Sequence, residues 1–375
     1  MKVAIITLSP YANMGGILQA YALQHIVKKM GHSCEQLCWW KLPYPIAYRT
    51  LRGLVFVMNH LPKALQQWLY KHLPEAANRP ISKAIISQNT YQFINQYITY
   101  SSIPINKLKE NDFDVYIAGS DQLWRYFERT FDCRTFLDFT SNWNVKRFSY
   151  AASFGKDNID DYPLEYKEKV KTLLKEFNAI SVRENTGINI CKNELNVDAI
   201  QLIDPTLLLS SNEYMNLVSR YRNHLKKNTG LMCYVLDRND AIDKLANKIA
   251  DQKGIEIFQS NSNIDDKSLP PYQRIQIPVE QWLEYFNNAD CIITDSFHAC
   301  VFSIIFHKPF LVIGNKQRGM TRFESLLKMF NLEQCLITED KIEKAQMPNI
   351  DYNKVNEILK KEQTKAFAFL KENLN

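Results

Sequence analysis

The stretch between residues 291 and 313 constrains the fold of this chain more than any other. Cys291 to Thr294 is a short apolar run typical of a buried strand, and the polar Asp295 and Ser296 come directly after it. An apolar, helix-like run follows over 297–306, and 310–313 indicates the next strand. This order predicts a strand–turn–helix–strand unit of a parallel sheet. Ligands of such sheets bind at the carboxyl ends of the strands.

Three side chains at this predicted strand end are suited to chemistry. His298 is a candidate acid or base, because imidazole titrates near neutral pH. Ser296 stands where the free N–H groups of a helix N-terminus can bind an anion. Asp295 either orients His298 or caps the helix, and capping is the more frequent role of an Asp at such a turn.

Strands and helices alternate along the whole chain, which predicts an α/β fold with mostly parallel sheets. We expect strands at 2–7, 35–40, 114–118, 147–152, 179–182, 199–203, 231–236 and 255–258, and helices at 17–30, 163–177, 241–251, 279–288 and 353–373. A polar stretch at 210–212 and a basic one at 220–227 indicate a domain junction. The predicted domains are therefore 1–209 and 210–345, with a terminal helix in 346–375 that crosses back onto the first domain.

Composition limits the class of protein. A chain of 375 residues favours two domains, and a net charge of +6 without a dense Lys/Arg block argues against nucleic acid as a partner. The eight cysteines form no CxxC pair, so we expect neither disulfides nor a zinc site, and a cytoplasmic location. The first apolar run is too short for a signal peptide. Aromatic and basic residues in 41–105 fit either a packed insertion or contact with the inner face of a membrane.

The first half of the chain also has candidate binding residues at predicted strand ends. Gly15 and Gly16 lie between a strand and a helix and permit close approach of a ligand, although a plain tight turn explains them equally well. Ser120 and Asp121 follow the strand at 114–118. Arg183 follows the strand at 179–182, where its guanidinium can hold a carboxylate or phosphate.

These residues belong to an ordered set of short motifs spread over roughly residues 1–335. The motifs are Asn13–Ala20, Ala118–Gln122, Ser149–Ser153, Ser181–Glu184, Asp204–Leu208, Thr294–Ala299 and Arg322–Leu326. No single motif is specific, but the ordered set resembles the polysaccharide pyruvyl transferases. That resemblance implies two facing Rossmann-like domains, similar to the GT-B glycosyltransferase architecture, with the active cleft between them.

The resemblance also implies a reaction. Such enzymes transfer pyruvate from phosphoenolpyruvate onto two hydroxyls of a sugar, as a cyclic ketal, on a surface glycan or its lipid-linked precursor. They need no metal or cofactor for this. The resemblance makes His298 the catalytic residue and Arg183 a ligand of phosphoenolpyruvate, and we expect Phe297 beside them to contact substrate. Asn13, Gly15, Gly16, Ser120 and Asp121 would line the acceptor side.

One position departs from the family pattern. Many relatives carry an arginine that binds the donor where this chain has Ser296, whose hydroxyl and N–H can bind phosphate but supply no charge. Arg318, Arg322 and Lys316 are the candidates to replace it.

Two other functions fit the same architecture. A nucleotide-sugar glycosyltransferase would need a carboxylate for the ribose, for which Glu280 or Glu284 is a candidate. A binding or scaffold protein that has kept the fold would account for Ser296.

Overall fold

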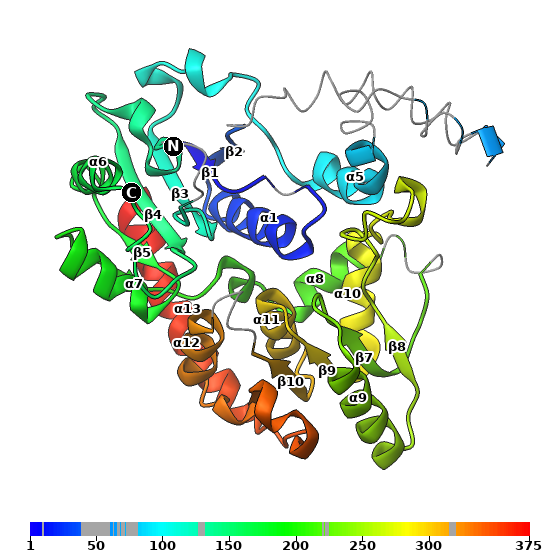
Figure 1. The fold of residues 1–375 in the computed structure, drawn as a ribbon. Helices are drawn as coiled ribbons and strands as arrows, with labels where there is room; N and C mark the ends of the chain where they lie inside the picture. The colour runs from blue at the N-terminus through cyan, green and yellow to red at the C-terminus, as the bar shows by residue number, and fades with distance from the viewer. Residues whose placement is uncertain are drawn as a thin grey trace.

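The computed structural model describes residues 1–9, 11–38, 61–62, 64–65, 68, 72, 82–126, 132–219, 221, 225–314 and 320–375. Within these residues the chain forms a six-stranded and a five-stranded sheet. Every strand pair in both sheets is parallel. The prediction of an α/β fold with two Rossmann-like halves is confirmed. Figure 1 shows the first sheet and the second sheet on opposite sides of α1.

The first sheet is built from the amino-terminal part of the chain. Its strand order is β2-β1-β3-β4-β5-β6. The strands are β1 Lys2–Ile6, β2 Ser33–Gln36, β3 Val115–Asp121, β4 Lys146–Ala152, β5 Ser181–Val182 and β6 Ile200–Gln201. All seven residues of β3 are buried, as expected of a central parallel strand covered on both faces.

The second sheet has the order β11-β10-β9-β7-β8. Its strands are β7 Gly230–Tyr234, β8 Ile257–Gln259, β9 Ala289–Thr294, β10 Phe310–Ile313 and β11 Leu336–Ile337. The predicted unit around His298 is therefore present, because β10 pairs parallel to β9 and α11 connects them. Pro309 precedes β10 and follows the end of that helix.

The helices over the described residues are α1 Met14–Lys29, α5 Gln88–Tyr97, α6 Leu164–Leu174, α7 Asn185–Asn189, α8 Ser211–Val218, α9 Asp240–Lys253, α10 Val279–Asn288, α11 Phe297–Ile305, α12 Thr321–Met329 and α13 Tyr352–Leu374. Helix α1 begins earlier than the predicted 17–30, since Asn13 accepts a hydrogen bond from the backbone N–H of Gly16 and caps it. Gly15 and Gly16 thus lie inside the first helical turn and not in the turn before it.

Several predicted strands were too long. The strand predicted at 35–40 ends at Gln36, and 179–182 and 199–203 shrink to two residues each. Phe148 and Ala179 form only an isolated bridge, so pairing continues at this edge without a continuous strand. The insertion at 41–105 falls largely outside the described residues; α5 is its longest described helix.

Alternate residues of the central strands face different cores. Val3 and Ile5 belong to the largest apolar cluster, while Ala4 and Ile6 belong to the cluster on the opposite face. The largest cluster also contains Trp282 and residues of both sheets. The two sheets therefore share one core, which holds their carboxyl ends in a defined relation.

The terminal helix connects the two halves. Near its start, the Tyr352 hydroxyl donates to the carbonyl oxygen of Lys308 at 2.6 Å. Near its end, the ring of Phe369 packs on Phe148 of β4 with 5.8 Å between centroids. Figure 1 shows this red helix passing α12 and ending beside the first sheet. No described helix is both long and apolar enough to cross a bilayer.

We predict that Phe369→Ala lowers the free energy of unfolding by about 3 kcal/mol, because it removes a buried ring from the shared core. Phe369 is 7% exposed, whereas Phe367 on the same helix is 36% exposed. Urea unfolding measures the difference. The matched variant Phe367→Ala should cost less than about 0.5 kcal/mol. Equal losses in the two variants would contradict the docking of α13 described here.

Candidate functional site

Acidic side chains meet at the carboxyl edge of the first sheet. Asp121 ends β3, Glu184 follows β5 by two residues, and Asp204 follows β6. Parallel strands bring their carboxyl ends to one edge, so residues far apart in the sequence become neighbours there. Arg183 lies between these three carboxylates, directly after β5.

Arg183 contacts all three acids through different nitrogens. Its Nη1 donates to Asp204 Oδ2 at 2.9 Å, its Nε to Glu184 Oε1 at 3.1 Å, and its Nη2 to Asp121 Oδ1 at 3.4 Å. The residue is only 4% exposed. Burial by itself would lower the pKa of Arg183, but Glu184, Asp121 and Asp204 outweigh it and hold that pKa above its ordinary value. The guanidinium is therefore a buried, fully charged group.

Asp204 links this cluster to the second sheet. Its Oδ1 accepts from the backbone N–H and hydroxyl of Thr206 at 3.0 and 2.7 Å. Its Oδ2 accepts from Arg183 and also lies 3.6 Å from Nε2 of His298, the second residue of α11. Burial would raise the pKa of Asp204, yet its interactions with His298, Arg183 and Thr206 hold that pKa well below the ordinary range. Asp204 is thus an ionised carboxylate between the two sheets.

His298 lies tightly against the start of α1. A Cβ atom built on Gly15 would stand 2.1 Å from both Cγ and Nδ1 of the His298 ring. Only a glycine permits this approach, so Gly15 is required at this position by the imidazole and not by a positive φ. The ring is therefore placed between Gly15 of the first sheet's helix and Asp204 at the end of β6.

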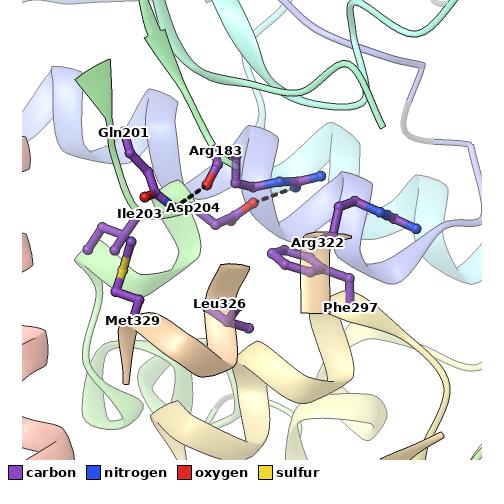
Figure 2. Close-up of a pocket in the computed structure, with 8 residues that line it drawn as sticks. All are labelled: Arg183, Gln201, Ile203, Asp204, Phe297, Arg322, Leu326 and Met329. Atoms are coloured by element: carbon purple, nitrogen blue, oxygen red, sulfur yellow. Dashed lines mark hydrogen bonds and ion pairs between the residues drawn. The ribbon is translucent and has the colours of Figure 1, made fainter. Parts of the chain in front are cut away.

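A small pocket opens beside this group. It is lined by Arg183, Gln201, Ile203, Asp204, Phe297, Arg322, Leu326 and Met329 (Figure 2). The Arg183 guanidinium lies 4.3 Å from the centre of the Phe297 ring, and that of Arg322 lies 5.9 Å from it. Both are within the range of a cation–π contact. The pocket therefore has two guanidinium groups around one aromatic ring.

The two cations differ in how their charge is balanced. Burial, followed by the positive charge of Arg183, lowers the pKa of Arg322 to about 10. A guanidinium with that pKa still carries its charge at neutral pH, and it would gain from a nearby anion. Glu184 and Asp121 act in the opposite direction on this pKa, as an anionic ligand in the pocket would.

The site residues come from motifs that match one family. A sequence model described as polysaccharide pyruvyl transferase matches residues 13–317, which is most of the chain. The chain belongs to the polysaccharide pyruvyl transferase family. Membership implies a transferase that acts on polysaccharide. A comparison with curated proteins gave no significant match.

Solved structures with a similar course of the chain are remote in sequence. UDP-GlcNAc 2-epimerase from Methanocaldococcus jannaschii is 12% identical, with 96% of this chain and 92% of that chain covered and a TM-score of 0.45. Arabidopsis thaliana UGT89C1 complexed with UDP is 14% identical, with 98% and 94% covered and a TM-score of 0.44. MurG of Acinetobacter baumannii is 10% identical, with 98% and 94% covered and a TM-score of 0.40.

The other residues expected at the pyruvyl transferase site have varied environments. Asn13 is exposed and caps α1, with Gly16 beside it. Ser120 is fully buried, and its hydroxyl donates to the carbonyl of Ala151 at 2.8 Å, so it supports the strand end. Ser296 is the N-cap residue of α11 but makes no capping bond with its side chain. Arg318 and Lys316 lie outside the described residues.

Asp295 has a role that neither sequence interpretation anticipated. Its two carboxylate oxygens accept the backbone N–H groups of Leu236 and Asp237 at 2.7 and 2.8 Å. It therefore joins the end of β9 to the segment after β7, while Ser296 occupies the N-cap position of α11. The ribose candidates Glu280 and Glu284 are buried in α10 and are not among the residues that line the pocket.

Both Asp204 and Glu184 stand in motifs identified from the sequence. Asp204 was given no role there, and Glu184 was considered only as a surface ion-pair partner of Arg183, whereas the pair is buried. The available signal was their place after strands that neighbour each other in a parallel sheet. Recognising it required the strand order β4-β5-β6, which the sequence does not state.

We predict that Gly15→Ala destabilises the protein by about 1–3 kcal/mol, since the added methyl group overlaps the His298 ring. Thermal unfolding measures the effect. Gly16→Ala is the matched control, because the nearest atom to its added Cβ is Asn13 Cγ at 3.5 Å, an ordinary contact. It should leave the melting temperature unchanged or slightly raised. A Gly15 variant as stable as the Gly16 variant would contradict the described packing.

We also predict an acid-dependent contribution from Asp204. Its folded pKa lies below that of an unfolded aspartate, about 3.9. Its ionised form therefore stabilises the fold above about pH 4, and this contribution is lost as the pH falls toward the folded pKa. The difference in unfolding free energy between wild type and Asp204→Asn should shrink on acidification. Urea titrations over a series of pH values test this, and a constant difference would contradict it.

Proposed function

We propose that the protein transfers the pyruvyl unit of phosphoenolpyruvate to two hydroxyls of one sugar in a surface glycan or its lipid-linked precursor. One observation carries the proposal. Arg183 from the first sheet and His298 from the second lie on the same carboxylate oxygen of Asp204, at 2.9 and 3.6 Å. The cation and the acid or base that this chemistry needs thereby meet at one carboxylate, which lines the pocket together with Arg183. Family membership supports the same reaction class.

The reaction defines what the residues must do. One sugar hydroxyl adds to C2 of the donor while C3 gains a proton and becomes a methyl group. The second hydroxyl then displaces phosphate from C2, which closes the ketal, and its proton leaves with the phosphate or through a base. We assign His298 to one of these proton transfers, since an imidazole can both take up and release a proton near neutral pH.

Donor binding requires positive charge. Arg183 and Arg322 both line the pocket and both contact the Phe297 ring, so we assign the contacts with the donor's phosphate and carboxylate to these two guanidiniums. Arg322 thereby supplies the charge that many relatives carry at the position of Ser296. The Phe297 ring contacts both guanidiniums, at 4.3 and 5.9 Å from its centre. Neither a metal nor a cofactor enters this scheme.

The acceptor is proposed to approach over the amino-terminal end of α1. Asn13 is exposed there, and Gly15 borders His298 directly. An amide side chain next to the proposed acid or base is suited to hold a sugar hydroxyl. We propose that the reaction takes place in the cytoplasm, at the inner face of the membrane when the acceptor is lipid-linked.

The test is release of inorganic phosphate from phosphoenolpyruvate, followed by ³¹P NMR with a panel of free and lipid-linked glycans. We expect release that depends on the glycan and falls by about 10²–10⁴-fold in His298→Ala. Arg322→Leu should raise the KM for phosphoenolpyruvate by about 10–100-fold, the value of a charge-assisted hydrogen bond.

His32→Ala is the matched histidine control, because His32 pairs with the chain's amino-terminal group at 3.5 Å and lies outside the site. It should retain wild-type turnover. A thermal shift with nucleotide sugars but none with phosphoenolpyruvate would move the assignment to a nucleotide-sugar glycosyltransferase. No shift with either ligand would favour a binding or scaffold protein.

A further inference from the structure

We propose that Asp204 is the positioning residue of His298: its carboxylate selects the tautomer of the neutral imidazole that has the proton on Nε2. The role in catalysis rests on the function proposed above. The orientation itself is a property of the protein without ligand.

The Asp204 side chain is held in one orientation and cannot rotate away from His298. The side chain is fully buried, and Oδ1 is held by both the N–H and the hydroxyl of Thr206. Oδ2 is held by Nη1 of Arg183 at 2.9 Å. The same Oδ2 lies 3.6 Å from Nε2 of His298. Figure 2 shows Asp204 bound to Arg183 at the edge of the pocket.

Nε2 of His298 is buried and has no hydrogen-bond partner among the described residues. A buried N–H beside an ionised carboxylate is favourable, whereas an unprotonated nitrogen would direct its lone pair at a negative charge. The 3.6 Å between Nε2 and Oδ2 is longer than a hydrogen bond. A small rotation of the ring would bring the two atoms within hydrogen-bond distance. Catalytic hydrogen bonds commonly shorten in this way when substrate binds. The proton therefore belongs on Nε2.

The other ring nitrogen, Nδ1, is on the side that packs against the start of α1, since a Cβ atom on Gly15 would overlap both Cγ and Nδ1. With the proton on Nε2, Nδ1 carries the lone pair of the neutral ring. The charged groups of the neighbouring cluster belong to several elements. They are Asp204 after β6, Arg183 and Glu184 after β5, Asp121 of β3, and Arg322 of α12 beside Phe297. Of these, the described ion pairs place only Asp204 within 4 Å of the imidazole.

This arrangement spans the two sheets. Asp204 follows a strand of the first sheet, and His298 begins a helix of the second. The ring is consequently oriented only when the two halves are packed against each other. Asp204 therefore has two roles. It forms the ion pair with Arg183, and it makes the orientation of the His298 ring depend on the packing of the two halves.

The experiment measures the tautomer directly. Wild-type protein labelled with ¹⁵N-histidine is examined without ligand, and the His298 signals are assigned among the seven histidines by their loss in His298→Gln. We expect the neutral ring to carry its proton on Nε2. In Asp204→Asn this preference should weaken, and kcat should fall by about 10²-fold. Asn caps as well as Asp does, so the Thr206 bonds can persist.

Glu184→Gln is the matched control. It removes one negative charge from Arg183, as Asp204→Asn does, but Glu184 is bonded to Arg183 and not to His298. It should change the KM for phosphoenolpyruvate and leave the tautomer as in wild type. The same change of tautomer in both variants would overturn the proposal.

A proton on Nδ1 in the wild type would overturn it without any variant, even if Asp204→Asn does not fold. Because the tautomer is measured without ligand, it also separates the two proposals. A protein with Nε2–H that does not react with phosphoenolpyruvate retains the assignment of Asp204 and loses only the proposed donor.

Discussion

Arg183 is a guanidinium withdrawn from water, and a charge in that position is stable only when it is paired and hydrogen-bonded. Three carboxylates meet this need, one at the end of each of the strands β3, β5 and β6 or just beyond it. Removing one partner of such a cluster typically costs about 3–5 kcal/mol, because the remaining charges stay buried. The edge of the first sheet is therefore fixed by electrostatics as much as by packing.

The same cluster sets the geometry of the candidate site. Hydrogen bonds from Arg183 and Thr206 fix the position of the Asp204 carboxylate. They thereby fix the carboxylate that lies 3.6 Å from His298. On the other side of the pocket, the Ser325 hydroxyl of α12 accepts hydrogen bonds from Gln201 and from the backbone of Asn185. The second sheet is thus joined to the first by polar contacts around the pocket and by a shared apolar core beneath it.

Prediction from sequence succeeded where the local pattern was long and both faces of an element were buried. The unit from Cys291 to Ile313 is an example, since a short apolar run, a polar turn and a proline leave few alternatives. The predictions were wrong at the short strands β5 and β6, of which only β6 is at the edge of the sheet. At β5 and β6, pairing stops after two residues because the chain turns into the site, and no local signal marks that turn. The start of α1 was also missed, since its capping by Asn13 depends on a conformation that propensity alone does not specify.

The sequence by itself determined the α/β class and the family, and it placed His298 and Arg183 in motifs of that family. These follow from local order and from motifs, which the chain carries in any conformation. Only the tertiary structure decided that Arg183 is balanced by three acids, that Arg322 shares its pocket, and that Asp204 stands beside His298. The physical reason is that parallel strands bring distant residues to one edge. Which residues meet there depends on strand order and domain packing, and no short segment of the sequence specifies either of them.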